Sequence, residues 1–327
     1  MGEKMWAVIV DEDQPLQLGQ AEKPICGDND VLVEVITAGL NRADLVQRRG
    51  LYPPPPGASH IMGLECAGTI VARGAAVTDW AVGDRVCGLL AGGGYAEYAA
   101  IDQGSLFKIP DSMSFDEAGA LPEVMMTVWA NIFDRCQFKA GETALIHGGT
   151  SGIGTMAIQM LKSAGAATIM ITAGSAEKCA FATELGADRA INYRDEDFEQ
   201  IVREAGGADV ILDMVGGDYV QKNISAAKVG GRIVNIAYMQ GAQVNLNLMP
   251  LMLKRLILTG TTLRARPNPE KQRIRDAVLA DFWPGVLSGA IKPVIDTVYP
   301  FDQAEQAQAH MAQGGHIGKI LLSRQQS

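Results

Sequence analysis

The sequence predicts an α/β protein that combines a doubly wound, six-stranded parallel sheet with a second, antiparallel and barrel-like β region. Three observations predict this fold class. Short β-like runs separated by Gly and Pro fill the first third of the chain, β and α patterns alternate from about residue 142, and 327 residues suffice for about two domains. A hydrophobic fraction of 47% and 37 Gly residues fit a globular chain with many tight turns.

The β-like runs of the first region are short and bounded by turn residues, which is typical of antiparallel strands. The expected strands are 5–10, 31–37, 66–72, 85–89 and 95–100. After Pro267 we expect a helix, a strand, a helix and a strand at 270–287, 292–299, 301–313 and 319–322. We expect this tail to pack against the first region. The predicted domains are therefore residues 1–123 with 267–327, and residues 124–266.

The middle region alternates β and α patterns. Its expected strands are 143–147, 168–172, 190–193, 210–213, 232–237 and 256–262. Helical patterns at 153–164 and 176–185 separate the first three strands, and helical stretches lie between most of the others. Strands joined by helical crossovers run parallel in one sheet, so this region predicts the doubly wound part of the fold.

Composition and charge exclude several classes of protein. A net charge of −9 and a pI near 5.0 argue against a nucleic-acid binder, because such a chain cannot neutralise a phosphate backbone. No segment reaches the ~20 apolar residues of a membrane span, and the first residues lack the apolar core of a signal peptide. Five scattered Cys residues without a CxxC pair indicate free thiols, so we expect a cytoplasmic protein.

A glycine-rich turn joins the first strand and the first helix of the middle region. Its sequence is His147-Gly148-Gly149-Thr150-Ser151-Gly152-Ile153-Gly154. Small residues let the backbone approach a pyrophosphate, and a helix N-terminus offers N–H groups and positive potential. The spacing differs from the standard GxGxxG pattern. The position of the turn, first in a series of βα units, therefore carries the prediction of a dinucleotide site.

The end of the next strand bears on which dinucleotide is bound. In an NAD site an acidic residue usually stands there and binds the ribose hydroxyls. Here the position is Gly174 or Ser175, and Lys178 follows one helical turn later. A small neutral pocket beside a cation suits a 2′-phosphate, so the residues favour NADPH. A Lys178 that only faces solvent is the alternative interpretation.

Zinc ligands are sparse in the sequence. A tetrahedral zinc site needs Cys, His or carboxylate side chains that converge from several positions. The four His residues are scattered, and Cys66 beside Glu65 has no third or fourth ligand at a useful spacing. Without a Lewis acid to stabilise an alkoxide, we expect hydride transfer to an acceptor that is already electron-poor.

Five segments between residues 41 and 159 form a recognisable set. They are Asn41 to Leu45, Tyr52 to Gly57, Gly63 to Gly68, Gly83 to Val86, and the glycine turn followed by Gln159. In this order and spacing they resemble the zinc-free quinone oxidoreductase branch of the medium-chain dehydrogenase/reductase superfamily. The first two segments are most similar to the NADPH quinone reductases related to zeta-crystallin. Zinc-binding relatives carry Cys where this chain has Asn41 and His where it has Leu64.

The resemblance implies a GroES-like β-barrel catalytic domain, a Rossmann NADPH-binding domain and no metal. Asn41 and Tyr52 would be the catalytic residues. The implied contacts with NADPH are Asn41 and Thr127 at the nicotinamide, Thr262 and Leu263 at its carboxamide, Ile236, Ala237 and Tyr238 at its ribose, Gly152 and Ile153 at the pyrophosphate, Gly174, Ser175, Lys178 and Tyr193 at the 2′-phosphate, and Lys319 approaching the cofactor from the tail.

The favoured function is zinc-independent hydride transfer from NADPH to quinones, in a cleft between the two domains. Asn41 and Tyr52 would donate hydrogen bonds to the carbonyl oxygen, or to the water that protonates it. A Tyr52 that only packs on the proline run is the alternative for that side chain. The alternative functions are an NADPH-dependent reductase of α,β-unsaturated carbonyls and a cofactor-binding protein with negligible turnover.

The expected partner besides the small-molecule quinone or enone is a second copy of the chain. The last strand of the predicted parallel sheet, 256–262, is apolar and lies at an edge where it can pair with its own copy. The family is commonly dimeric, so we expect a homodimer that binds neither nucleic acid nor membrane.

Overall fold

The computed structural model describes residues 2–11 and 14–324, and the chain divides into two compact units. Unit 1 consists of Met1–Met126, Arg264–Trp283 and Lys292–Ser327, and unit 2 of Thr127–Leu263 and Pro284–Ile291. The sequence-based domains divide the chain after residues 123 and 266, whereas these units divide it after residues 126 and 263. Residues 284–291, which the sequence analysis grouped with the tail, belong to unit 2.

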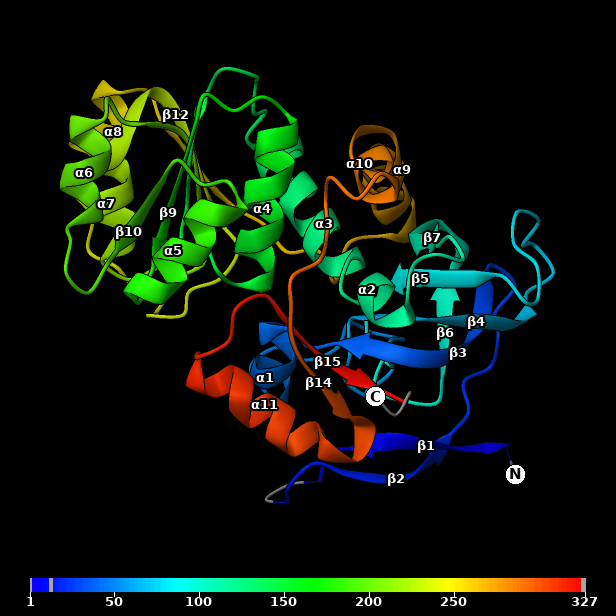
Figure 1. The fold of residues 1–327 in the computed structure, drawn as a ribbon. Coiled ribbons are helices and arrows are strands. Elements are labelled where there is room, and N and C mark those ends of the chain that lie inside the picture. Colours follow the sequence, from blue (N-terminus) through cyan, green and yellow to red (C-terminus); the bar gives the residue numbers. More distant parts are fainter. Residues whose placement is uncertain (1, 12–13, 325–327) are drawn as a thin grey trace. The chain divides into compact units, whose positions relative to one another are not determined.

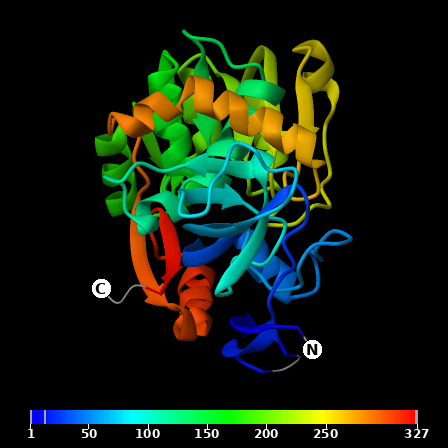
Figure 2. The same ribbon diagram turned by 90° about the vertical axis from the view of Figure 1, so that its right-hand side faces the viewer.

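Unit 1 is built on a mostly antiparallel sheet. Among the described residues its strands lie in the order β14 (Ile295–Pro300), β15 (Lys319–Ser323), β3 (Asp30–Gly39), β4 (Glu65–Arg73), β5 (Arg85–Leu89) and β7 (Leu106–Lys108), and β6 (Tyr98–Asp102) also pairs with β3. Strand β15 pairs antiparallel with β3 and parallel with β14. The C-terminal tail therefore completes the sheet of the first region, as the sequence predicted, and Figure 2 shows β14 and β15 beside helix α11 (Ala304–Gln313).

Shorter elements surround this sheet. They are the hairpin β1 (Lys4–Ile9) and β2 (Gln17–Glu22), the helices α1 (Arg42–Arg48), α2 (Phe115–Gly119) and α3 (Pro122–Val128), and the 3₁₀ turns η1 (Gln103–Ser105) and η3 (Phe301–Gln303). The helix expected at 270–287 is wrong as one element, since it divides into α9 (Asn268–Asp281) and α10 (Trp283–Leu287). Pro284 explains the break, because inside a continuous helix its ring would clash with the carbonyl four residues earlier.

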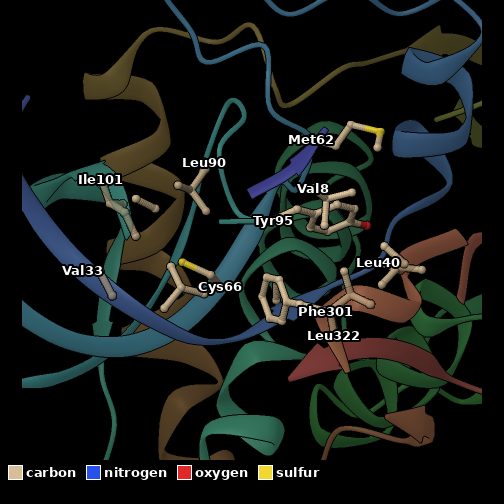
Figure 3. Close-up of a cluster of buried hydrophobic side chains, with 14 of the residues drawn as sticks. Val8, Val33, Leu40, Met62, Cys66, Leu90, Tyr95, Ile101, Phe301 and Leu322 are labelled. Atoms are coloured by element: carbon tan, nitrogen blue, oxygen red, sulfur yellow. The ribbon is translucent and has the colours of Figure 1, made fainter. Parts of the chain in front are cut away.

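The core of unit 1 lies between the sheet and the elements that cover it. Alternate positions of β3, Val31, Val33 and Val35, are fully buried, as expected when one face of a strand packs inward. Tyr95, Phe301 and Leu322 come from distant parts of the chain and join the same cluster (Figure 3). Burial of such side chains, at about 25 cal/mol per Å² of apolar surface, ties the C-terminal segment to the N-terminal one.

Unit 2 is a doubly wound sheet. Within the part of the chain that the structure describes, six parallel strands lie in the order β10 (Arg189–Asn192), β9 (Thr168–Ala173), β8 (Thr143–Ile146), β11 (Ala208–Asp213), β12 (Ala227–Asn235) and β13 (Ile257–Gly260). Helices α4 (Gly152–Ser163) and α5 (Ala176–Leu185) cover one face. Helices α6 (Phe198–Glu204), α7 (Tyr219–Ala226) and α8 (Met249–Leu253) lie on the other face (Figure 1). The predicted α/β class with a six-stranded parallel sheet is confirmed.

The strand order of unit 2 reverses between β8 and β11, which are neighbours in the sheet. Loops at the carboxyl ends of such a pair diverge in opposite directions, and ligands of open α/β sheets bind there. A π-helix, η2 (Trp129–Arg135), precedes β8, and the sequence pattern did not predict it. Among the described residues no helix has the length and apolar character that a membrane span requires.

Candidate dinucleotide and catalytic sites

The glycine turn lies at the carboxyl end of β8, directly before α4. Ser151 is the N-cap residue of α4, and its Oγ accepts the N–H of Gly154 at 3.0 Å and donates to the carbonyl of Gly148 at 2.8 Å. A Cβ at Gly149 would lie 2.4 Å from Cβ of Ile171, and one at Gly154 would lie 2.4 Å from the carbonyl oxygen of Gly148. Neither glycine therefore has room for a side chain, and the N–H groups of Gly152 and Ile153 at the start of α4 can face an anionic ligand.

A chain of buried polar side chains lies beneath this turn. The Nδ1 of His147 lies 3.0 Å from Oγ1 of Thr172, and its Nε2 lies 2.7 Å from Oδ1 of Asn223. The Nδ2 groups of Asn223 and Asn235 donate to Oδ2 of Asp213 at 3.1 and 2.9 Å. Burial lowers the pKa of His147, against the opposing charge of Asp213. The network connects the ends of β8, β9, β11 and β12, and the sequence analysis named none of these residues except His147.

The residues predicted at the adenosine end meet at the carboxyl end of β9. Ser175 is the N-cap residue of α5, and its Oγ accepts the N–H of Lys178 at 3.2 Å. A Cβ at Gly174 would lie 2.5 Å from the phenol oxygen of Tyr193, so Tyr193 covers the position where NAD sites carry an acid. Tyr193 is 47% exposed. These four residues lie together as the sequence analysis expected.

The residues predicted at the nicotinamide end of unit 2 lie on three segments. Thr127 is buried, and its carbonyl accepts Nδ2 of Asn131 at 2.8 Å. The loop after β12 contains Ile236, whose N–H donates to the carbonyl of Asp213 at 2.8 Å, followed by Ala237 and the half-exposed Tyr238. Thr262 and Leu263 follow β13. Gly152 and Ile153, predicted at the pyrophosphate, begin α4. The start of α4 and the segments after β12 and β13 lie at the edge at which the parallel strands end, whereas Thr127 belongs to helix α3.

The candidate catalytic residue of unit 1, Asn41, lies between β3 and α1 and touches a buried ion pair. The ammonium of Lys319 donates to Oδ1 of Asn41 at 2.8 Å and to the carbonyl of Leu40 at 2.6 Å, and it lies 2.7 Å from Oε1 of Glu65. The Nδ2 of Asn41 donates to the same Oε1 at 3.0 Å. The other carboxylate oxygen, Oε2, accepts the N–H of Glu123 at 2.9 Å. Asn41 is thus held by groups from β4 and β15.

A second buried carboxylate, Asp44, stabilises the backbone at Asn41. Its Oδ2 accepts the N–H of Asn41 and the hydroxyl of Tyr95, both at 2.8 Å. Burial raises the pKa of Asp44 to about 6, although these hydrogen bonds and the charge of Lys319 act in the opposite direction. Burial also raises the pKa of Tyr95 far above its ordinary value, so Tyr95 acts as a hydrogen-bond donor.

The other candidate catalytic residue, Tyr52, belongs to a loop that Arg264 holds in place. The guanidinium of Arg264 donates to the carbonyls of Ala91 at 2.7 Å and Tyr52 at 3.0 Å and to Oε1 of Gln47 at 2.8 Å, and it lies 5.2 Å from the centre of the Tyr52 ring. Burial raises the pKa of Tyr52, and the charge of Arg264 opposes this rise. Sequence reasoning missed Arg264, because no motif marks a single arginine.

The residues around Asn41 do not fit a zinc ion. Asn41 offers a neutral amide, Leu64 offers no ligand atom, and Glu65 is already neutralised by Lys319. Among the described residues no group of three or more His, Cys, Asp and Glu side chains is arranged to hold a metal. His147 is buried, and both of its ring nitrogens lie within hydrogen-bond distance of side chains in unit 2.

Comparisons with known proteins now place the chain in a family. Residues 27–111 match the family model described as "Alcohol dehydrogenase GroES-like domain", and residues 152–279 match "Zinc-binding dehydrogenase". The quinone oxidoreductase of Homo sapiens is 30% identical over 304 residues, which are 91% of this chain and 90% of that protein.

The chain belongs to the quinone oxidoreductase branch of the medium-chain dehydrogenase/reductase superfamily. The "Synaptic vesicle membrane protein VAT-1 homolog" of Danio rerio is 31% identical over 92% of this chain, and the chain spans 65% of that relative's length. Among solved structures, the quinone oxidoreductase of Pseudomonas syringae is 30% identical, with a TM-score of 0.84 over 99% of this chain and 100% of that one. The predicted GroES-like domain and the predicted family are confirmed.

Membership in the medium-chain dehydrogenase/reductase superfamily implies an oxidoreductase that uses a nicotinamide cofactor. The glycine turn of unit 2 fits the pyrophosphate of such a cofactor, since two of its glycines leave no room for a Cβ. The structure brings together the residues predicted for the adenosine end, and it places Asn41 with Lys319. All three N–H groups of the Lys319 ammonium have acceptors within unit 1. The contact between Lys319 and the cofactor stays a prediction.

Proposed function

We propose that the protein is an NADPH-dependent, zinc-independent quinone oxidoreductase. The observation that carries this proposal is the site at Asn41, where a carboxamide tied to the Lys319–Glu65 ion pair takes the place of a set of metal ligands. Without a metal the site has no Lewis acid to activate an alcohol. A quinone needs no such activation, because it is an electron-poor acceptor.

The preference for NADPH is supported by the end of β9. An acidic side chain at residue 174 would displace the phenol of Tyr193, so the position that selects NAD elsewhere stays without charge. Ser175, Lys178 and Tyr193 then supply two hydroxyl groups and an ammonium for a 2′-phosphate. The bound cofactor supplies the hydride for the reaction.

The chain's own residues have two proposed tasks. The start of α4, the loops after β12 and β13 and one residue of α3 bind and orient the cofactor, through Gly152, Ile153, Ile236, Ala237, Tyr238, Thr262, Leu263 and Thr127. The Nδ2 of Asn41 and the hydroxyl of Tyr52 donate hydrogen bonds to the oxygen on which negative charge develops, or to the water that protonates it. The raised pKa of Tyr52 keeps its hydroxyl protonated at neutral pH, as a donor requires.

A substrate panel tests the proposed function. Purified protein treated with a metal chelator is assayed with NADPH against a series of quinones and a series of alkenals and enones. Turnover of quinones, unchanged by the chelator, is expected. Turnover of alkenals alone would establish the enone reductase instead. Tight NADPH binding without oxidation by any acceptor would indicate a cofactor-binding protein.

The cofactor assignment has its own test. We expect Lys178→Ala to weaken NADPH binding about tenfold, because it removes a charge-assisted hydrogen bond, and to leave NADH binding nearly unchanged. Fluorescence titration with both cofactors measures the two dissociation constants. Lys162→Ala, on the preceding helix α4, is the matched control. An equal loss for NADPH and NADH would contradict the 2′-phosphate site.

We also propose a homodimer formed through the edge of the parallel sheet. Strand β13 is the last strand of its sheet, and large apolar side chains around it are exposed, namely Leu248, Met249, Met252, Leu253 and Ile257. An unpaired strand edge beside an apolar patch is typical of a subunit interface. Sedimentation at micromolar concentration should give a dimer, and Met252→Lys with Leu253→Lys should give a monomer. The control Val82→Lys, at an exposed apolar residue of unit 1, should leave the dimer intact.

A further inference from the structure

The ion pair beside Asn41 has a geometry that goes beyond simple charge neutralisation. Lys319 comes from the start of β15, and Glu65 from the start of β4. The two side chains are 5% and 0% exposed, and each of them contacts a different end of the Asn41 carboxamide. The ammonium faces Oδ1, and the carboxylate faces Nδ2.

The chemistry of these two groups permits only one orientation of the amide. An ammonium group only donates hydrogen bonds, and a carboxylate only accepts them. If the carboxamide turned by 180°, its oxygen would face Glu65 and its NH₂ group would face Lys319, so both hydrogen bonds would be lost. Neutral partners such as Gln or Ser would allow both orientations, because they donate as well as accept.

One N–H of Asn41 remains weakly engaged in this orientation. Nδ2 donates to Glu65 at 3.0 Å, whereas its contact with the carbonyl of Gly39 is 3.4 Å long. A contact of that length is a weak hydrogen bond that a better acceptor can replace. Hydride transfer to a quinone places negative charge on an oxygen, and such an oxygen needs a donor rather than an acceptor.

We propose that Lys319 and Glu65 are positioning residues that lock the Asn41 carboxamide with an N–H directed to the reacting oxygen. Lys319 acts through Asn41 and not on the cofactor. This inference rests on the proposed function, because the donor matters only if an oxyanion develops. It assigns a task to the tail of the chain, since Lys319 follows Asn41 by 278 residues.

Three variants test the proposal: Lys319→Met, Glu65→Gln and the double variant. Each single variant leaves one buried charge without its partner and lowers the melting temperature. The double variant leaves no unpaired charge, so its melting temperature should recover relative to both single variants. The glutamine that replaces Glu65 offers both a donor and an acceptor, and therefore no longer fixes the amide.

The expected result separates stability from positioning. In Lys319→Met and in the double variant, kcat for quinones should fall ten- to a hundredfold, as it does when a hydrogen-bond donor is lost or displaced. The dissociation constant of NADPH should change less than twofold. Lys228→Met is the matched control, because it breaks the ion pair with Asp209 in unit 2, and its kcat should stay at the wild-type value. Recovery of kcat together with the melting temperature in the double variant would overturn the proposal.

A structural readout keeps this test apart from the test of the function. In protein labelled with ¹⁵N-asparagine, the side-chain amide signals of Asn41 are assigned by their loss in Asn41→Leu. They should exchange slowly with solvent in the wild type and quickly in Lys319→Met. If the wild type reduces no quinone, the proposed function fails, and this exchange rate alone decides whether Lys319 locks the amide. Equal exchange rates in both proteins would refute the lock.

Discussion

Each unit has a fully buried carboxylate at its candidate site, Glu65 in unit 1, where Asp44 lies nearby, and Asp213 in unit 2, and Glu65 and Asp213 are stabilised in different ways. Glu65 in unit 1 is paired with the ammonium of Lys319. Asp213 in unit 2 has no cation among the partners that the structure describes. It accepts the N–H groups of Val215 and Gly216 and the amides of Asn223 and Asn235, at 2.7 to 3.2 Å.

The difference shows how the two sites are assembled. The donors to Asp213 come from within 22 residues of it, on the following loop, helix and strand. The partners of Glu65 are Asn41, Glu123 and Lys319, which lie 24, 58 and 254 residues away along the chain. In unit 2, nearby backbone N–H groups and side-chain amides thus stabilise the carboxylate of Asp213. In unit 1, the ammonium of Lys319, which is distant in the sequence, stabilises the carboxylate of Glu65.

The largest expected effect compares the two carboxylates directly. Glu65→Gln leaves the Lys319 ammonium buried without a counter-charge, which costs about 3–5 kcal/mol of unfolding free energy. Asp213→Asn leaves no unpaired charge and loses only part of the acceptor capacity, which costs about 1–3 kcal/mol. Urea unfolding at pH 7 measures both. A larger loss of unfolding free energy for Asp213→Asn than for Glu65→Gln would show that the amide network contributes more to stability than the ion pair does.

The second effect concerns pH in unit 1. The pKa of Asp44 is about 6 in the folded chain against an ordinary value of 3.8, so the folded state binds the proton more tightly. Unfolding free energy should therefore rise as pH falls from 7 through 6 towards 4, by roughly 3 kcal/mol in total. Asp44→Asn should lack this gain.

Tryptophan fluorescence allows this measurement on unit 1 alone. Of the four Trp residues, Trp6, Trp80 and Trp283 belong to unit 1 and Trp129 to unit 2, so Trp129→Phe leaves only reporters of unit 1. Urea titrations of this background, with and without Asp44→Asn, are run at several pH values. Parallel pH dependences in the two proteins would argue against a buried, proton-binding Asp44.

The smallest effect is expected from His147 and has the opposite sign. Burial lowers its pKa in the folded chain, so the unfolded state binds the proton more tightly. This contribution to stability is present above the ordinary value of 6.5 and is lost as pH falls below it. In a variant with Trp6, Trp80 and Trp283 replaced by Phe, Trp129 is the only Trp reporter, and unit 2 should lose stability at pH values where unit 1 gains it. His147→Gln should abolish the loss, and a loss that persists would have to arise from another group.

Much of the fold follows from local sequence patterns. All six strands of the parallel sheet were expected at their places, because buried strands of a parallel sheet are continuous apolar runs. Strand β2 was not expected, since its sequence Gln17 to Glu22 is polar and no position in it is fully buried. The π-helix η2 was not expected either, because its Trp129–Arg135 sequence gives no periodic sign that distinguishes it from an α-helix.

The candidate sites divide in the same way. The sequence alone determined the glycine turn, the absence of an acid at residue 174 and the replacement of zinc ligands by Asn41 and Leu64, because each depends on residue types at short, fixed spacings. Only the tertiary structure showed that Lys319 reaches Asn41 and Glu65, that Arg264 holds the Tyr52 loop and that a network of buried polar side chains, to which Asp213 belongs, connects the ends of four strands. These contacts join residues that lie far apart in the sequence. They form only because packing brings β15 and the loops next to their partners, and the spacing of residues along the chain does not show which distant segments will meet.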